Sequence, residues 1–149
     1  GYTMQNAVKL DEIDHKIMNL LYENARISVS EIGRIISMTQ PAVKERINKL
    51  EDQGVIAAYR TKFEPSKINK NIQAFIMFKT SQCSDFIQYC NAAPEVTDLY
   101  RISGEFNYMM KVMSDSMDSL AAFLDSLMQF GLSSPLIVLK SEFEEKLSF

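Results

Sequence analysis

The stretch SEIGRIISMTQPAVKERINKLEDQGVIAAY, residues 30–59, decides the predicted fold of the first part of the chain. Three of its apolar residues recur at the spacing of a helix with one buried face, namely Val43, Ile47 and Leu50. Thr39 precedes this helix as a candidate N-cap, and Pro41 lies in its first turn, where a missing N–H costs nothing. Gly54 follows at the position where helices commonly end in a left-handed residue. The stretch therefore predicts one sharply bounded helix.

Two shorter helices are predicted before it. Apolar residues at helical spacing follow Asp11, a candidate N-cap, and predict a first helix that runs to about Asn24. A second helix begins near Val29 and ends at a short break formed by Ser37 and Met38. After the third helix, residues 55–60 and 62–63 are predicted as short strands. Three helices followed by a small hairpin predict a winged helix-turn-helix domain over residues 1–62.

The buried stripe of the third helix turns its opposite face outward. Gln and Asn side chains can pair with adenine in the major groove, whereas Arg and Lys pair with guanine or phosphate. Arg46 and Lys49, on the flanks of this face, are suited to phosphate. We predict that double-stranded DNA is bound by Thr39, Gln40, Ala42, Lys44, Arg46, Asn48 and Lys49. Three-helix domains with a polar third helix also bind proteins, and a charged helix face is often only solvated, so this alternative stays open.

Charge is distributed unevenly along the chain. The formal net charge is −3. Residues 1–62 contain 9 Lys and Arg against 8 Asp and Glu, a balance of +1, whereas residues 63–149 contain 7 against 11, a balance of −4. The negative total therefore does not exclude nucleic-acid binding by the first segment.

The second part of the chain predicts a different domain. Residues 63–71 are polar, contain a proline and are interpreted as a linker. Beyond them, alternating strand and helix patterns are expected at residues 72–80, 84–92, 96–103, 108–113, 116–128 and 136–140. Their order, β-α-β-β-α-β, predicts a ferredoxin-like domain over residues 72–149 and an α+β fold for the chain.

The predicted strands are apolar on both alternations, as in Phe75, Ile76, Met77 and Phe78. A sheet with one face in water would alternate apolar and polar residues. We therefore expect the second face to be covered by another copy of the chain, which gives a homodimer.

With these patterns in view, the chain resembles the Lrp/AsnC, or feast/famine, family of transcription regulators from about Lys9 to the end. Three stretches carry the resemblance: LDEIDHKIMNLLYENARIS at residues 10–28, the stretch at residues 30–59 quoted above, and YRISGEFNYMMKV at residues 100–112. The resemblance implies a sequence-specific regulator whose C-terminal ferredoxin-like domain, called RAM, forms dimers that assemble further, commonly into octamers as tetramers of dimers.

The resemblance also implies a small-molecule effector, in many members an amino acid bound between dimers near the turn after the second strand. In this chain the expected effector-binding residues are Gly104, Glu105, Phe106 and Asn107, with Ser133 and Ser134 contributing. Members that bind amino acids often carry an aspartate where Asn107 stands. The segment 131–135 also looks short, with Pro135 where the family favours threonine. These departures predict weak or absent binding of simple amino acids.

Other functions have less support. An enzyme is not expected, because His15 is the one histidine and no nucleophile, metal set or phosphate-binding glycine loop accompanies it. No cofactor or metal is expected, and the two cysteines are interpreted as reduced. The lack of a long apolar run or signal-peptide pattern predicts a cytoplasmic protein without a membrane contact. The alternative function is an oligomeric small-molecule-binding module that acts without DNA. The sequence leaves open whether Gly1–Thr3 are native or precede a start at Met4.

Overall fold

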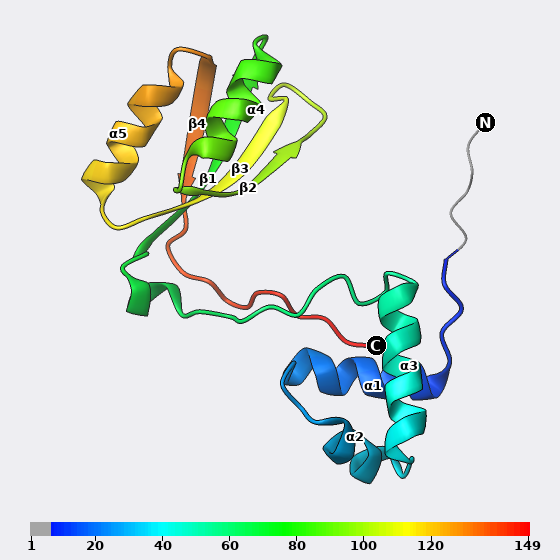
Figure 1. Cartoon of the computed structure of the whole chain (residues 1–149). Helices are drawn as coiled ribbons and strands as arrows, with labels where there is room; N and C mark the ends of the chain where they lie inside the picture. Colours follow the sequence, from blue (N-terminus) through cyan, green and yellow to red (C-terminus); the bar gives the residue numbers. More distant parts are fainter. Residues whose placement is uncertain (1–6) are drawn as a thin grey trace, which may run out of the picture. The chain divides into compact units, whose positions relative to one another are not determined.

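A computed structural model describes residues 7–149 of the chain, so the status of Gly1–Thr3 lies outside the described residues. The chain divides into two compact units, of which one contains the chain up to Lys62 together with Phe143–Phe149. The other unit contains Phe63–Glu142. Figure 1 shows the first unit built of helices, and the second built of a sheet with helices packed against it.

The first unit is built from helices α1 (Glu12–Glu23), α2 (Val29–Ile36) and α3 (Gln40–Asp52). Its core joins all three helices through Ile17, Met18, Ile32, Val43, Ile47 and Leu50. The predicted buried stripe of α3 is confirmed, since Val43 is fully buried and Leu50 is 1% exposed. Ser37 takes a left-handed conformation between α2 and α3, as a tight break requires.

Both long helices of this unit begin as predicted. The Thr39 hydroxyl accepts a hydrogen bond from the Ala42 N–H at the start of α3. Asp11 and Asp14 form a capping box at the start of α1, in which each carboxylate accepts a hydrogen bond from the backbone N–H of the other residue. The guanidinium of Arg46 donates to both carboxylates, at 2.5 Å to Asp11 and 3.3 Å to Asp14. This bridge ties α3 to the first turn of α1.

The prediction of strands at residues 55–60 and 62–63 was wrong, because residues 53–71 contain no strand. Val55 and Ile56 pack on the helical core, whereas Ala57–Phe63 is exposed throughout. An isolated two-stranded ribbon is only marginally stable in water. Thr61 is also the single residue between the two predicted strands, whereas the common hairpin turns need two.

The second unit is the predicted β-α-β-β-α-β arrangement. Its elements are β1 (Ile72–Thr80), α4 (Cys83–Ala92), β2 (Val96–Arg101), β3 (Tyr108–Ser114), α5 (Met117–Leu127) and β4 (Gly131–Ile137), preceded by a 3₁₀ turn, η1 (Pro65–Ile68). The antiparallel sheet has the order β2-β3-β1-β4. Both helices pack on one sheet face around Phe78, Phe86 and Tyr108 (Figure 1). The Ser116 hydroxyl caps α5 by accepting a hydrogen bond from the Ser119 N–H.

The last strand lies earlier than predicted. β4 covers Gly131–Ile137 rather than residues 136–140, so the segment interpreted as a loop before the strand is the strand itself. Ser and Pro suggested a loop, but pairing with β1 decides the outcome, with Gly131 opposite Thr80. Pro135 is tolerated because β4 is an edge strand. A Cβ on Gly131 would lie 2.0 Å from the Lys79 carbonyl oxygen, so this position requires glycine.

The C-terminal tail, Phe143–Phe149, packs with the first unit, although we expected it in the ferredoxin-like domain. The Asn19 side-chain amide donates to the Phe149 carbonyl and accepts from the Phe149 N–H, both at 2.9 Å. The rings of Tyr22 and Phe149 meet edge to face at 6.5 Å. A long-range contact of this kind has no periodic signal in the sequence.

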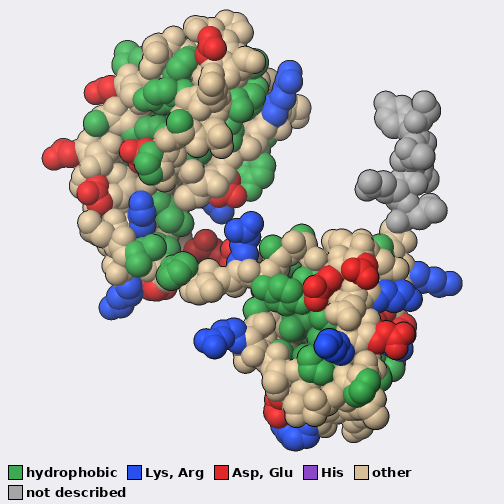
Figure 2. Space-filling model, viewed as in Figure 1, with side chains coloured by type: hydrophobic (Ala, Val, Ile, Leu, Met, Phe, Trp, Pro, Cys, Tyr) green, Lys and Arg blue, Asp and Glu red, His purple; other side chains and the backbone are tan. Residues whose placement is uncertain are grey.

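The outer face of the sheet remains partly open. Residues facing away from the helices alternate with the buried ones, and the apolar members are Phe75, Met77, Tyr100, Met109, Met113, Leu132 and Leu136. Tyr100 is 46% exposed and Leu136 is 55% exposed. Figure 2 shows that apolar side chains reach the surface of both units.

The bridge between Arg46 and Asp11 predicts a pH-dependent stability of the first unit. The Arg46 guanidinium and the Asp14 N–H lower the pKa of Asp11 to about 2. A carboxylate with a lowered pKa stabilises the fold above its unfolded pKa of about 4, and this stabilisation is lost as the pH falls toward 2. We expect Asp11→Asn, which keeps the N-cap acceptor, to lower stability at pH 6 and to match the parent near pH 2. Urea unfolding followed by circular dichroism at each pH measures this. A difference that does not vary with pH would show that the charge is not responsible.

Candidate nucleic-acid interface and effector site

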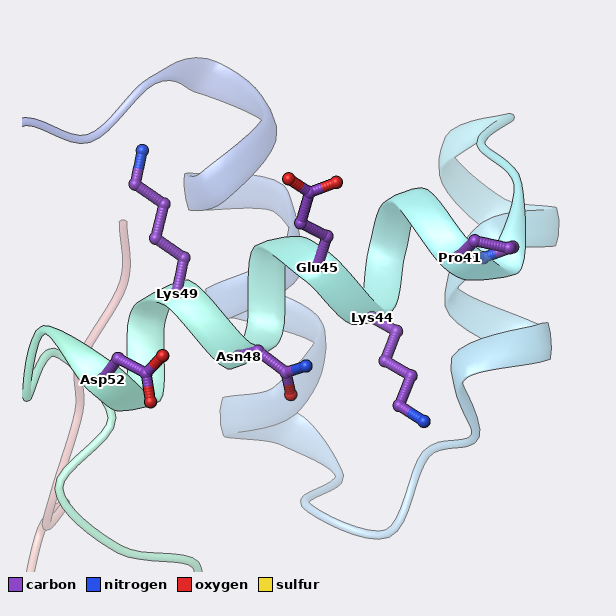
Figure 3. A pocket seen from close by; sticks show the side chains of 6 residues that line it. All are labelled: Pro41, Lys44, Glu45, Asn48, Lys49 and Asp52. Atoms are coloured by element: carbon purple, nitrogen blue, oxygen red, sulfur yellow. The ribbon is translucent and has the colours of Figure 1, made fainter.

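The outward face of α3 is polar and open to solvent. Gln40, Lys44, Asn48 and Lys49 are all exposed, as predicted. A shallow groove along the helix is lined by Pro41, Lys44, Glu45, Asn48, Lys49 and Asp52 (Figure 3). A second hollow at the start of the helix is lined by Val29, Gln40, Pro41 and Lys44. Four predicted DNA-binding side chains therefore share one accessible surface.

Thr39 and Ala42 have structural tasks at the start of this surface. The Thr39 hydroxyl is occupied by the cap, and the Ala42 N–H supplies the hydrogen for it. Thr39 is exposed and Ala42 is half-buried. Their predicted contact with DNA is therefore limited to what the cap leaves free.

Arg46 is arranged differently from the other predicted cations. Its side chain is 30% exposed, and its guanidinium is held by Asp11 and Asp14. We interpreted Arg46 as a phosphate ligand. In the structure its guanidinium instead connects α3 to the first turn of α1. The sequence counted it as an available positive charge because its partners lie 35 and 32 residues away.

Three residues outside the predicted set also line the surface. Pro41 and Asp52 lie toward the two ends of the groove, and Glu45 lies between them (Figure 3). Their spacing on the helix, opposite the buried stripe, was the available signal.

The turn between β2 and β3 contains four of the six predicted effector residues, Gly104, Glu105, Phe106 and Asn107. Gly104 has a φ of +112°, which favours glycine over any residue with a side chain. Glu105 is exposed, and Phe106 is half-buried. The Ile102 N–H donates to the Asn107 carbonyl at 3.0 Å and closes the turn. A backbone that a ligand can approach closely is thus present.

Asn107 is already occupied by the backbone of β1. Its amide donates to the Thr80 carbonyl at 2.8 Å, and its oxygen accepts from the Thr80 N–H at 3.0 Å. The Asn107 N–H donates to the Phe78 carbonyl at 3.0 Å. The side chain therefore extends the β1–β3 ladder by one residue before the start of β3, and its hydrogen-bonding groups are already engaged within the chain.

Ser133 and Ser134 lie in β4 and not in a loop. Ser133 is opposite Phe78, whose side chain is buried under the helices, whereas Ser134 is opposite Met77 on the outer face. Consecutive strand residues point to opposite faces, so the two hydroxyls do not share one pocket within this chain. β1 also separates both from the turn, a span of two strand spacings, or about 10 Å.

Within the described residues there is neither a cluster of metal-ligating side chains nor a helix able to span a membrane. No group of three His, Cys, Asp or Glu side chains among residues 7–149 is placed to hold a metal ion. In the same range no helix is long and apolar enough to cross a membrane. Cys83 and Cys90 are free thiols, and burial raises the pKa of Cys90 to about 11.

The double hydrogen bond of Asn107 predicts the effect of giving this chain the aspartate that the resemblance would favour. In Asn107→Asp, a carboxylate oxygen would replace the amide donor that faces the Thr80 carbonyl. We expect this change to destabilise the second unit by about 1–3 kcal/mol, because a donor is lost and two acceptors are opposed. Urea unfolding at pH 7 measures the loss.

Glu105→Gln is the matched control, since it exchanges the same functional groups at an exposed position of the same turn. It should leave the stability within about 0.5 kcal/mol of the parent. Equal stability of Asn107→Asp and the parent would contradict a structural role for Asn107.

Similarity to known proteins covers both units. Residues 10–57 match the winged helix-turn-helix DNA-binding family, and residues 73–145 match the Lrp/AsnC ligand-binding domain. The chain is 33% identical to the uncharacterised HTH-type transcriptional regulator YezC of Bacillus subtilis over 132 residues, 89% of this chain and 95% of the relative. It is 35% identical to the regulator LrpB of the same species over 126 residues, 83% of this chain and 85% of that protein.

Solved structures give the same result. Bacillus subtilis LrpC superposes with a TM-score of 0.87 at 27% identity over 93% of this chain and all of that one. A regulator from Neisseria meningitidis, solved as a complex with L-Met, superposes with a TM-score of 0.84 at 27% identity over 94% of each chain. YezC, LrpB and LrpC are all named as HTH-type transcriptional regulators. The polar outward face of α3, the ferredoxin-like sheet and these matches together show that the chain belongs to the Lrp/AsnC family of DNA-binding transcriptional regulators.

Proposed function

We propose that this regulator binds specific DNA sites through the exposed face of α3, as a dimer or higher assembly whose ferredoxin-like domain binds a small molecule. The observation that carries the proposal is the solvent-facing row of Gln40, Lys44, Asn48 and Lys49 on a helix whose other side is fixed in a core. A rigid helix of this width fits the major groove. Because the chromosome is the target, we place the protein in the cytoplasm.

The side chains of this row have separate roles in the proposal. Lys44 and Lys49 lack an acidic partner within the described residues, so they remain available for phosphate. Gln40 and Asn48 carry both a donor and an acceptor, which suits the adenine edge. Arg46 positions α3 from behind through Asp11 and Asp14.

Salt dependence tests this division. Lys44→Ala and Lys49→Ala should each reduce the slope of log affinity against log salt by roughly one, because each removes a phosphate contact. Arg46→Ala should weaken binding to all sequences yet leave the slope unchanged, because its charge is committed within the protein. Fluorescence anisotropy with labelled duplexes at several salt concentrations measures both. Unchanged slopes in both lysine variants would show that α3 does not lie on DNA.

The outer sheet face supports the proposed dimer. Apolar side chains of all four strands reach this face, and the two central strands supply Phe75, Met77 and Met109. A sheet with this composition is stabilised when a second copy covers it. A two-fold arrangement places the same surface on both partners, and further pairing of dimers would give the tetramer of dimers expected from the family.

Met77→Lys tests the dimer. Met77 pairs with Met109 and Ser134 at the middle of the outer face, so a lysine there would place two ammonium groups in a dimer interface. We expect the parent to run as a dimer or larger species in light scattering and the variant to shift to the monomer while keeping its circular dichroism spectrum. Ser84→Lys is the control, because Ser84 is exposed on α4, on the other side of the sheet. This substitution should not dissociate the assembly. A monomeric parent at micromolar concentration would contradict the proposal.

We propose that the effector site involves the backbone of Gly104, Glu105 and Phe106, closed by another copy of the chain. The positive φ of Gly104 supports close approach of a ligand to this turn. L-methionine is present in the Neisseria relative, which makes amino acids the first class to examine. Since the Asn107 amide is occupied, an ammonium group would have to be received by Glu105.

A further inference from the structure

A carboxylate lies in the middle of the proposed DNA-binding surface. Glu45 is exposed on α3 and lines the groove between Pro41 and Asn48 (Figure 3). A negative charge at this place is unexpected on a surface that approaches phosphates. It therefore requires an explanation beyond general affinity for DNA.

No ion pair within residues 7–149 neutralises the carboxylate of Glu45. Among residues 7–149, the ion pairs involve Lys16, Arg34, Arg46 and Lys140, and none involves Glu45. Lys49 lies four residues further along the helix, which is the favoured spacing and direction for a pair with Glu45. Figure 3 shows both side chains extending from the same side of α3, yet no ion pair joins them.

In the major groove an ionised carboxylate can only accept hydrogen bonds. Cytosine presents only its N4 amino group there, as a donor, and Glu is a recognised partner for it. Adenine also presents an amino donor, but beside its N7 acceptor, which opposes a carboxylate. At a site without such a donor, the carboxylate loses hydration and faces phosphate charge without compensation. The same group is therefore favourable at one kind of base pair and unfavourable elsewhere.

We propose that Glu45 is a specificity-determining residue, which accepts a hydrogen bond from the exocyclic amino group of cytosine and lowers the affinity for other DNA. This inference rests on the proposed function of α3. Lys44 and Lys49, on either side of Glu45 in sequence, supply the attraction to phosphate that brings the carboxylate to the base edges.

Glu45→Gln tests the inference, and Asp52→Asn is the matched control. Both remove one carboxylate from the same groove, but Asp52 lies at the C-terminal end of the helix. Binding sites are selected from a random duplex library with the full-length parent and both variants, and affinity for one unrelated duplex is measured at fixed salt. Circular dichroism checks that each exposed substitution leaves the fold intact.

We expect Glu45→Gln to bind the unrelated duplex several-fold more tightly and to lose preference for cytosine at one position of each half-site. The loss should be on the order of 5- to 100-fold, with a shift toward adenine, which glutamine can pair. Asp52→Asn should also bind the unrelated duplex more tightly but should select the same sequence as the parent.

Two results would overturn the inference. One is an unchanged base preference in Glu45→Gln while Lys44→Ala still reduces the salt slope, which would leave the proposed function standing. The other is a parent protein whose selected sites contain no cytosine at the position where Glu45→Gln changes the base preference. By contrast, if neither Lys44→Ala nor Glu45→Gln changes the affinity, the salt slope or the base preference, the proposed function of α3 itself is contradicted.

Discussion

The burial of one side of α3 is the constraint on which the rest of the first unit depends. Val43, Ile47 and Leu50 can be removed from water only if the opposite side of the helix faces solvent. Arg46 then fixes the position of α3 relative to α1, because its guanidinium joins α3 to the capping box of α1. The DNA-binding surface is thus specified by packing on its far side, and its own side chains remain free to vary with the target sequence.

Side-chain amides that substitute for backbone groups connect distant segments in both units. Asn107 gives and receives a hydrogen bond with Thr80, and Asn19 does the same with Phe149. An aspartate would keep the acceptor and lose the donor in either position, so the uncharged amide has a structural reason. We had interpreted the missing charge of Asn107 as a weakness in ligand binding. The paired hydrogen bonds with Thr80 instead explain why an uncharged amide stands at this position.

The elements predicted correctly from the sequence are those whose signal is local. The period of apolar residues located α1, α3 and α5, and the predicted caps at Asp11 and Thr39 marked the starts of α1 and α3. β4 was misplaced because pairing with β1 outweighs the loop-forming tendency of Ser133, Ser134 and Pro135. The Arg46 bridge and the docking of the tail on Asn19 join residues far apart in sequence, which one chain without a spatial model does not reveal. The outward face of α3 was predictable, but which of its charges are free was not.

The state of each charge decides how a chain with a net charge of −3 can bind DNA. Between Arg34 and Lys49 the sequence contains four basic residues, but Arg34 is paired with Glu31, and Arg46 is paired with Asp11 and Asp14. The attraction to phosphate therefore depends on Lys44 and Lys49, opposed by the free carboxylate of Glu45. With so few net charges at the proposed interface, we expect general affinity for DNA to be modest and base contacts to supply much of the binding energy. A surface of this kind favours discrimination between sites over tight binding to any sequence.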